Sequence, residues 1–113
     1  MSFNITQLEE NNILTINVTG DLDNETYQGL EHVIKENLAD KHFRVLIDFS
    51  GVHGFCSAAE FVLIWANKEI CNAGGKLVLC CGSPSVYELM VAFGLNTHLP
   101  IFSNLEEALQ SFK

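Results

Sequence analysis

The clearest structural signal in the chain lies in residues 45–66, VLIDFSGVHGFCSAAEFVLIWA. The apolar run that ends at Phe49 has the length of a strand, and its consecutive apolar residues indicate burial on both faces, as in a parallel sheet. The second apolar run continues to Cys71 with few breakers, which predicts a helix that opens near Ser57. Turn residues between the two runs predict a short loop: Ser50, Gly51 and Gly54. A buried strand, a loop and a helix make up half of a βαβ unit.

Hydrophobic periodicity outside this stretch extends the unit to the order ββαβαβαβα. The predicted strands are residues 5–8, 13–18, 43–49, 76–81 and 99–102. The predicted helices are residues 27–38, 58–72, 84–94 and 104–112, and Gly74-Gly75 end the second of them. The first is a short edge strand, the second has near-alternating polarity, and the two are expected to form a hairpin. We therefore expect an α/β fold whose sheet is mostly parallel, with an antiparallel edge strand, and is packed with about four helices.

The composition indicates one domain, residues 1–113, because 48% hydrophobic and 18% charged residues suffice for a compact core. The net charge of −8 argues against nucleic acid and anionic membranes as partners, since both require clustered basic residues. The N-terminus has no basic start followed by an apolar segment, and no run approaches the roughly 18–20 apolar residues that span a bilayer. We expect a cytoplasmic protein.

The four cysteines lack the spacing of a metal site or a disulfide framework. They are Cys56, Cys71, Cys80 and Cys81. We expect buried, reduced side chains, with Cys80 and Cys81 on opposite faces of a strand, and no bound metal or cofactor.

The predicted helix at 58–72 has two distinct apolar faces. One face should pack on the sheet and consists of Ala59, Val62, Leu63, Ala66 and Ile70. Phe61 and Trp65 lie one turn apart on another face. This aromatic pair is either a docking surface or is covered by neighbouring helices, and the sequence leaves both interpretations open.

Six short motifs lie in order along nearly the whole chain. They are Gly20-Asp21-Leu22-Asp23, VLIDFSGV at 45–52, NAGGKL at 72–77, Ser83-Pro84-Ser85-Val86, Phe93-Gly94-Leu95 and Glu106-Glu107-Ala108-Leu109. In this order and spacing they resemble the STAS domain, the fold of bacterial anti-sigma factor antagonists. The resemblance implies a STAS-like mixed sheet and a protein that binds other proteins rather than an enzyme.

In that family, the loop after the central strand reads roughly D-S-[ST]-G-L, and its serine is phosphorylated by a partner kinase that is itself the anti-sigma factor. The aligned residues are Cys56-Ser57-Ala58-Ala59-Glu60, of which only the serine matches the pattern. The resemblance therefore implies that Ser57 is a phosphoacceptor. A phosphate there would add about −1.5 to −2 charges at a helix start and block docking to a partner built for a neutral serine.

A second interpretation of Ser57 comes from the residues alone. Ser57 and Glu60 have the S-x-x-E spacing of a capping box, in which each side chain would bond the backbone N–H of the other. Asp23 has a similar double interpretation. In relatives the corresponding loop contributes to the partner-binding face, whereas the sequence alone predicts a helix cap.

The predicted partner-binding surface follows from these motifs and comprises Asp21, Asp23, Cys56, Ser57, Ala58, Glu60, Phe61 and Trp65. The first functional hypothesis is a module that sequesters an anti-sigma factor of the serine-kinase type, with phosphorylation of Ser57 as the off-switch. The alternative is a divergent, non-phosphorylated STAS scaffold that uses the Phe61 and Trp65 face in a multiprotein signalling complex. A third, less supported hypothesis is an enzyme with Cys56 as nucleophile and His53 as base. The sequence leaves self-association open.

Overall fold

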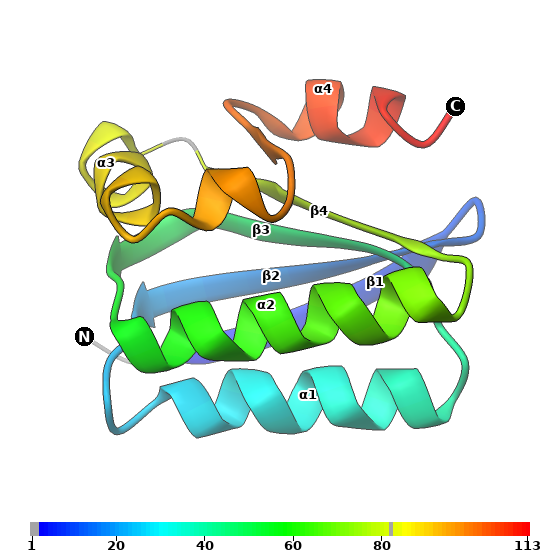
Figure 1. Cartoon of the computed structure of the whole chain (residues 1–113), viewed down its shortest axis with the longest axis horizontal. Coiled ribbons are helices and arrows are strands. Elements are labelled where there is room, and N and C mark those ends of the chain that lie inside the picture. The colour runs from blue at the N-terminus through cyan, green and yellow to red at the C-terminus, as the bar shows by residue number, and fades with distance from the viewer. Residues whose placement is uncertain (1–2, 82) are drawn as a thin grey trace.

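The computed structural model describes residues 3–81 and 83–113 and confirms the predicted order of elements (Figure 1). The strands are β1 (Asn4–Glu10), β2 (Ile13–Asp21), β3 (Arg44–Gly54), β4 (Lys76–Cys80) and β5 (Ile101–Phe102). The helices are α1 (Tyr27–Ala39), α2 (Ser57–Asn72), α3 (Pro84–Ala92) and α4 (Leu105–Gln110). A short 3₁₀ helix, η1 (Leu95–Thr97), follows α3 and was not predicted.

The strands form one sheet in the order β1-β2-β3-β4-β5. The hairpin of β1 and β2 is antiparallel, and every later pairing is parallel. The tight turn of the hairpin is made by Asn11 and Asn12, which both have positive φ (55° and 64°), a conformation that asparagine tolerates better than most residues. The mixed sheet with an antiparallel edge strand is therefore confirmed.

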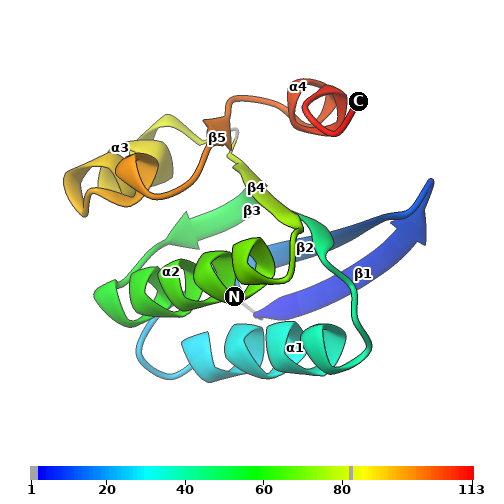
Figure 2. The ribbon, with the colours of Figure 1, turned by 45° about the vertical axis from the view of Figure 1, so that its right-hand side comes forward.

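Helices cover the two faces of the sheet unequally. Helices α1 and α2 lie side by side on one face, whereas α4 lies across the other face over β3, β4 and β5, with α3 beside the sheet end (Figure 2). The α2 residues predicted to pack on the sheet are all buried, and they are Ala59, Val62, Leu63, Ala66 and Ile70. Side chains alternate along β3, so Ile47 faces α2 while Leu46 belongs to the smaller core under α4.

Strand β3 is longer than predicted, and the expected loop at residues 50–54 is wrong. Its second half pairs with β2, where Thr19 lies opposite Gly51 and Asp21 opposite Gly54. The glycine at 51 permits this approach, because a Cβ there would lie 2.7 Å from Thr19 Cγ2. The residues that suggested a turn therefore form a strand that carries the chain to the start of α2.

The predicted end of α2 is confirmed. Gly74 takes a positive φ of 82°, and the N–H of Gly75 donates to Ile70 O at 2.8 Å. Gly75 also lies against the backbone of Phe43, where a Cβ would be only 2.1 Å from the carbonyl oxygen. The two adjacent glycines therefore have different roles, since Gly74 reverses the chain and Gly75 permits close backbone packing.

The cysteines only partly follow the prediction. Cys80 and Cys81 are buried and belong to different cores, which confirms that they point to opposite faces. Burial raises the pKa of both thiols, and the Asp48 carboxylate raises that of Cys80 further. Cys71 is exposed and Cys56 is half-buried, so the expectation of four buried cysteines is wrong.

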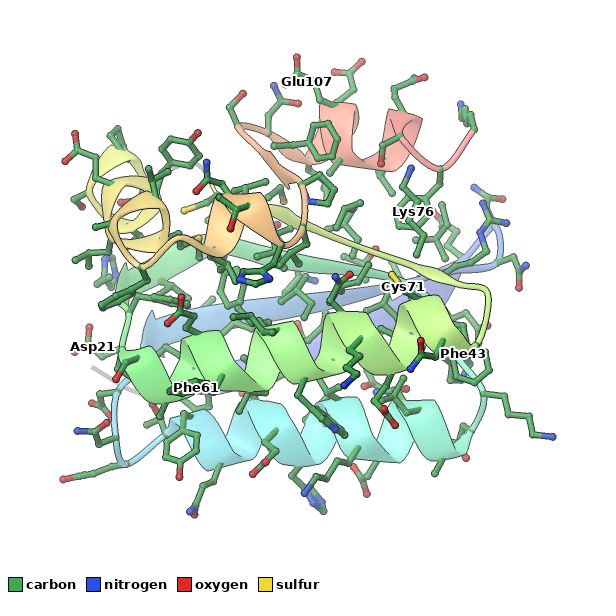
Figure 3. The ribbon with its side chains drawn as sticks, viewed as in Figure 1. Asp21, Phe43, Phe61, Cys71, Lys76 and Glu107 are labelled. Atoms are coloured by element: carbon green, nitrogen blue, oxygen red, sulfur yellow. The ribbon has the colours of Figure 1, made fainter. Side chains whose placement is uncertain are left out.

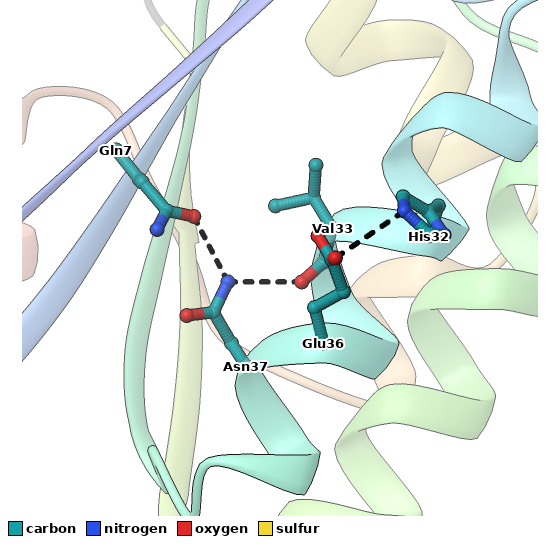
Figure 4. A network of polar contacts seen from close by, with 5 residues as sticks. All are labelled: Gln7, His32, Val33, Glu36 and Asn37. Atoms are coloured by element: carbon teal, nitrogen blue, oxygen red, sulfur yellow. Dashed lines mark hydrogen bonds and ion pairs between the residues drawn. The ribbon is translucent and has the colours of Figure 1, made fainter.

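One buried polar side chain ties the edge strand to the helical layer. Asn37 of α1 is 5% exposed, and its amide donates to Gln7 Oε1 of β1 and to Val33 O, both at 2.9 Å (Figure 4). His32 and Glu36 form an exposed pair nearby on the same helix. Both amide hydrogens of Asn37 are hydrogen-bonded, so its burial leaves no donor without an acceptor. The bond to Gln7 also holds β1 in a defined position against α1.

Candidate partner-binding site

Most of the residues predicted to bind a partner lie at or just after the carboxyl ends of β2 and β3, whereas Phe61 and Trp65 lie one and two turns along α2. The N–H of Leu22 donates to Gly54 O at 3.1 Å, which holds the loop after β2 against the residues that lead into α2. Figure 3 shows Asp21 close to the first turn of α2 and Phe61 farther along the outer side of that helix. Parallel strands bring their carboxyl ends to one edge, and this edge carries the candidate site.

Ser57 is the first residue of α2, and it does not cap the helix. Cys56 takes the cap position with an extended backbone (φ −127°, ψ 164°), and its carbonyl accepts the N–H of Glu60 at 3.2 Å. The predicted capping box between Ser57 and Glu60 is therefore wrong, because Ser57 already lies within the helix and no side chain makes a capping hydrogen bond at this end. Ser57 is exposed, and its hydroxyl makes no hydrogen bond with any residue that the structure describes.

The start of α2 presents unpaired backbone N–H groups and the positive end of the helix dipole beside this hydroxyl. A phosphate on Ser57 would be tolerated there by the helix itself. Glu60, half-buried in the same first turn, would oppose it. The arrangement thus offers an accessible hydroxyl whose modification would not disrupt a fold contact.

Asp23 organises the loop between β2 and α1. Its carboxylate accepts the N–H groups of Glu25 (2.9 Å) and Thr26 (3.1 Å), and its own N–H donates to Thr26 Oγ1 at 2.9 Å. The Thr26 oxygen also lies 2.7 Å from Asp21 O. Since α1 begins at Tyr27, Asp23 caps the turn before the helix rather than the helix itself. Asp21 and Asp23 remain exposed in this loop.

The same hydrogen bonds lead to an expected pH dependence of the loop. The backbone N–H of Glu25 is the largest cause that lowers the pKa of Asp23 below its ordinary value of 3.8. Because the folded-state pKa is depressed, the carboxylate supports the loop above pH 3.8 and ceases to do so as the pH falls through the lower, folded-state value. Titration of the Asp23 side-chain resonances by NMR should give a pKa below 3.8. A pKa of 3.8 or above would contradict these contacts.

The two aromatic residues of α2 differ in exposure: Phe61 is open to solvent, as a docking surface requires, whereas Trp65 is partly covered by a neighbouring helix. Phe61 is 71% exposed. Trp65 is half-buried and packs against the core, with Lys35 Nζ of α1 at 5.7 Å from its ring centroid. Helix α1 thus covers part of Trp65, and Phe61 is the exposed aromatic side chain of the pair.

Helix α3 adds apolar residues that the sequence did not assign to the site. The Phe93 ring lies 6.0 Å from the ring of Phe55, which precedes Ser57 by two positions, yet Phe93 is 38% exposed. Leu89, one turn earlier, is 40% exposed. Helical periodicity marked both as apolar positions, but their exposure depends on how α3 sits at the sheet end, which no local pattern specifies.

We call the residues predicted to bind a partner the α2 entry surface. Four of them are exposed, namely Asp21, Asp23, Ser57 and Phe61, and four are half-buried, namely Cys56, Ala58, Glu60 and Trp65. Its acidic side chains come from two segments far apart in the sequence. Phe93 and Leu89 adjoin it through Phe55.

The structure gives little support for chemistry at Cys56. His53 is exposed on β3, and no hydrogen bond joins it to Cys56 among the described residues. Within residues 3–81 and 83–113, no group of three or more His, Cys, Asp or Glu side chains is placed to hold a metal ion. None of the helices in this part of the chain is long and apolar enough to cross a membrane.

Solved structures of other proteins share this fold over almost their whole length. An anti-sigma factor antagonist from Mycobacterium paratuberculosis aligns over 97% of this chain and 93% of its own, with a TM-score of 0.89 and 22% identity. A STAS domain protein from Planctomyces limnophilus aligns over 96% and 97%, with a TM-score of 0.79 and 24% identity. The Bacillus cell fate determinant SpoIIAA in its phosphorylated form aligns over 99% and 100%, with a TM-score of 0.70 and 16% identity.

These likenesses define the class of the fold, which is that of the anti-sigma factor antagonists. The sequence profile of the STAS domain matches residues 4–108. The chain belongs to the STAS domain family.

Proposed function

We propose that this protein is a binding module of the anti-sigma factor antagonist type, which sequesters an anti-sigma factor of the serine-kinase type through the α2 entry surface. The observation that carries the proposal is the exposed, unbonded Ser57 hydroxyl at the start of α2, with Asp21 close to the first turn of that helix (Figure 3) and the exposed ring of Phe61 one turn further on. The protein binds its partner without catalysing a reaction, and binding takes place in the cytoplasm.

Phosphorylation of Ser57 by the bound partner would be the off-switch. The phosphate would add about −1.5 to −2 charges to a surface that already carries Asp21 and Asp23. At an interface built for a neutral hydroxyl, that charge is repelled and costly to desolvate, and a change of a few kcal/mol alters affinity by orders of magnitude. The modification would break no hydrogen bond at the start of α2, since the Ser57 side chain makes none there.

Two similarities support this assignment. A protein of the same fold from Mycobacterium paratuberculosis is described as an anti-sigma factor antagonist, and SpoIIAA has been solved in a phosphorylated form. The loop of this chain keeps the serine of the family motif but replaces its neighbours by Cys56, Ala58, Ala59 and Glu60. The kinase partner would therefore recognise a loop with an acidic residue three positions after the serine.

Phe61→Ala should weaken partner binding by at least about 30-fold, because an exposed aromatic ring near the centre of an interface is a typical hot spot. The measurement is titration calorimetry with the serine-kinase anti-sigma factors of the source organism. Leu105→Ala is the matched control, since Leu105 is 40% exposed but lies on α4 across the sheet. Equal affinity of the Phe61→Ala variant and the wild type would reject Phe61 as part of the interface.

The alternative function is a non-phosphorylated STAS scaffold in a signalling complex. It is favoured by the altered loop and by the 71% exposure of Phe61, which needs no modification to bind a partner. Both functions use the same surface, and they differ in whether a negative charge at Ser57 abolishes binding.

A further inference from the structure

Strand β1 leaves one edge of the sheet without a neighbour. The sheet order places β1 at one end and β5 at the other. Strand β5 has two residues, whereas β1 has seven residues in unbroken register with β2. In the described part of the chain no element runs along the outer side of β1, and α1 lies below the sheet rather than beside its edge (Figure 2). A row of backbone N–H and C=O groups is therefore available for pairing.

Strand β1 lacks most of the sequence features that prevent an edge strand from pairing with another chain. Its sequence, NITQLEE, contains no proline and no lysine, and its pairing with β2 has no bulge. Leu8, near its centre, is 58% exposed on the face away from α1 and α2. The hydrogen bond from Asn37 to Gln7 holds the strand in place, so little ordering would be needed before it paired.

The charges of β1 select the orientation of a second strand. Its only charged residues, Glu9 and Glu10, stand at one end. A parallel copy would place these glutamates beside their own counterparts, which is unfavourable. In an antiparallel copy centred on Gln7, Glu10 lies opposite Asn4 and Leu8 lies opposite Thr6, so no like charges face each other.

We propose that β1 pairs antiparallel with β1 of a second copy of this chain, so that two sheets join into one across a two-fold axis near Gln7. The two Leu8 side chains then become diagonal neighbours on the same face, within reach of each other. Leu8 also lines a hollow of about 410 Å³ with Leu105 and Phe112 of the same chain, and the second Leu8 extends its apolar wall. This burial covers the most exposed aliphatic side chain of the described residues.

The pairing is independent of the proposed function but affects its geometry. The α2 entry surface lies at the carboxyl ends of β2 and β3. Because the joined sheets run antiparallel, the two entry surfaces lie at opposite ends of the dimer. Each dimer would therefore present two binding sites that point away from each other.

Sedimentation equilibrium of the full chain, up to on the order of 1 mM, tests this pairing. The wild type should dimerise, and Leu8→Lys should raise the dimer dissociation constant by about tenfold or more, because it places two lysines near the axis. Val91→Lys, an equal charge change on α3, should leave that constant unchanged, because Val91 is 38% exposed and lies outside the hollow that Leu8 lines. Ser57→Asp should also dimerise like the wild type, so a failure of the phosphorylation switch would not be mistaken for a failure of the pairing.

Amide hydrogen exchange gives an independent readout along the strand. Alternate N–H groups of residues 4–10 that point away from β2 should gain protection as the concentration rises, and Leu8→Lys should remove that gain. The proposal is overturned by a wild type that stays monomeric throughout, by equal effects of Leu8→Lys and Val91→Lys, or by outward amides whose exchange does not depend on concentration.

Discussion

Ser57→Asp is expected to weaken binding of the anti-sigma factor by at least about 100-fold, whereas Ser57→Ala should change the affinity by less than about threefold. The Ser57 hydroxyl is exposed and makes no hydrogen bond that supports the fold, so alanine removes nothing that the folded chain requires. Aspartate at the first helical position interacts favourably with the helix dipole, so the fold accepts the charge as well. The loss of affinity therefore reports on the interface alone.

The control for the charge is Gln110→Glu, because Gln110 is exposed on α4, across the sheet from the α2 entry surface, and the change adds one negative charge. It should bind the partner like the wild type in the same calorimetric titration. If Ser57→Asp and Ser57→Ala bind equally well, Ser57 is not a switch, and the non-phosphorylated scaffold becomes the better account.

Gly75→Ala should lower the free energy of unfolding by at least about 3 kcal/mol and can prevent folding altogether. The added Cβ would lie 2.1 Å from Phe43 O and 2.6 Å from Phe43 Cβ. The same carbonyl accepts the N–H of Lys76 at 2.7 Å, where β4 begins. The added Cβ would therefore clash with the backbone of Phe43. Moving the two segments apart would break the hydrogen bond at the start of the β3–β4 pairing.

Gly74→Ala is the control one residue away, and its cost should be about 1 kcal/mol. Gly74 has a positive φ of 82°, but a Cβ there would meet no heavy atom within 4 Å. Urea denaturation of the two variants separates a strained backbone angle from a steric overlap. Similar losses for both variants would show that the close approach of Phe43 is not the cause.

The fold could be predicted because its elements are marked by local periodicity. The five buried positions of α2 follow a helical pattern, and β3 begins with a continuous apolar run that only a doubly covered strand requires. The error at residues 50–54 arose because Gly51 and Gly54 are typical of turns. Their strand geometry depends on pairing with Thr19 and Asp21, about thirty residues earlier in the chain, and no local pattern carries that information.

The secondary structure around the candidate site could be predicted from the sequence, but its hydrogen bonds and the exposure of its side chains could not. The position of Ser57 at the start of α2 was predicted correctly. The S-x-x-E spacing, however, does not specify which residue is the N-cap, with extended rather than helical backbone angles. Cys56 takes that place, which leaves the serine hydroxyl free. The exposure of Phe61 and the cover over Trp65 depend on the packing of α1 against α2, a tertiary property.

Affinity capture from lysate of the source organism, with ATP present, tests the central claim most directly. Wild type, Ser57→Ala and Ser57→Asp serve as baits, and mass spectrometry identifies the retained proteins and maps phosphate on the recovered wild-type bait. The account predicts that wild type and Ser57→Ala retain a kinase-fold anti-sigma factor, that Ser57→Asp loses it, and that phosphate is found on Ser57. Retention of the same partners by all three baits, with Ser57 unmodified, would contradict it.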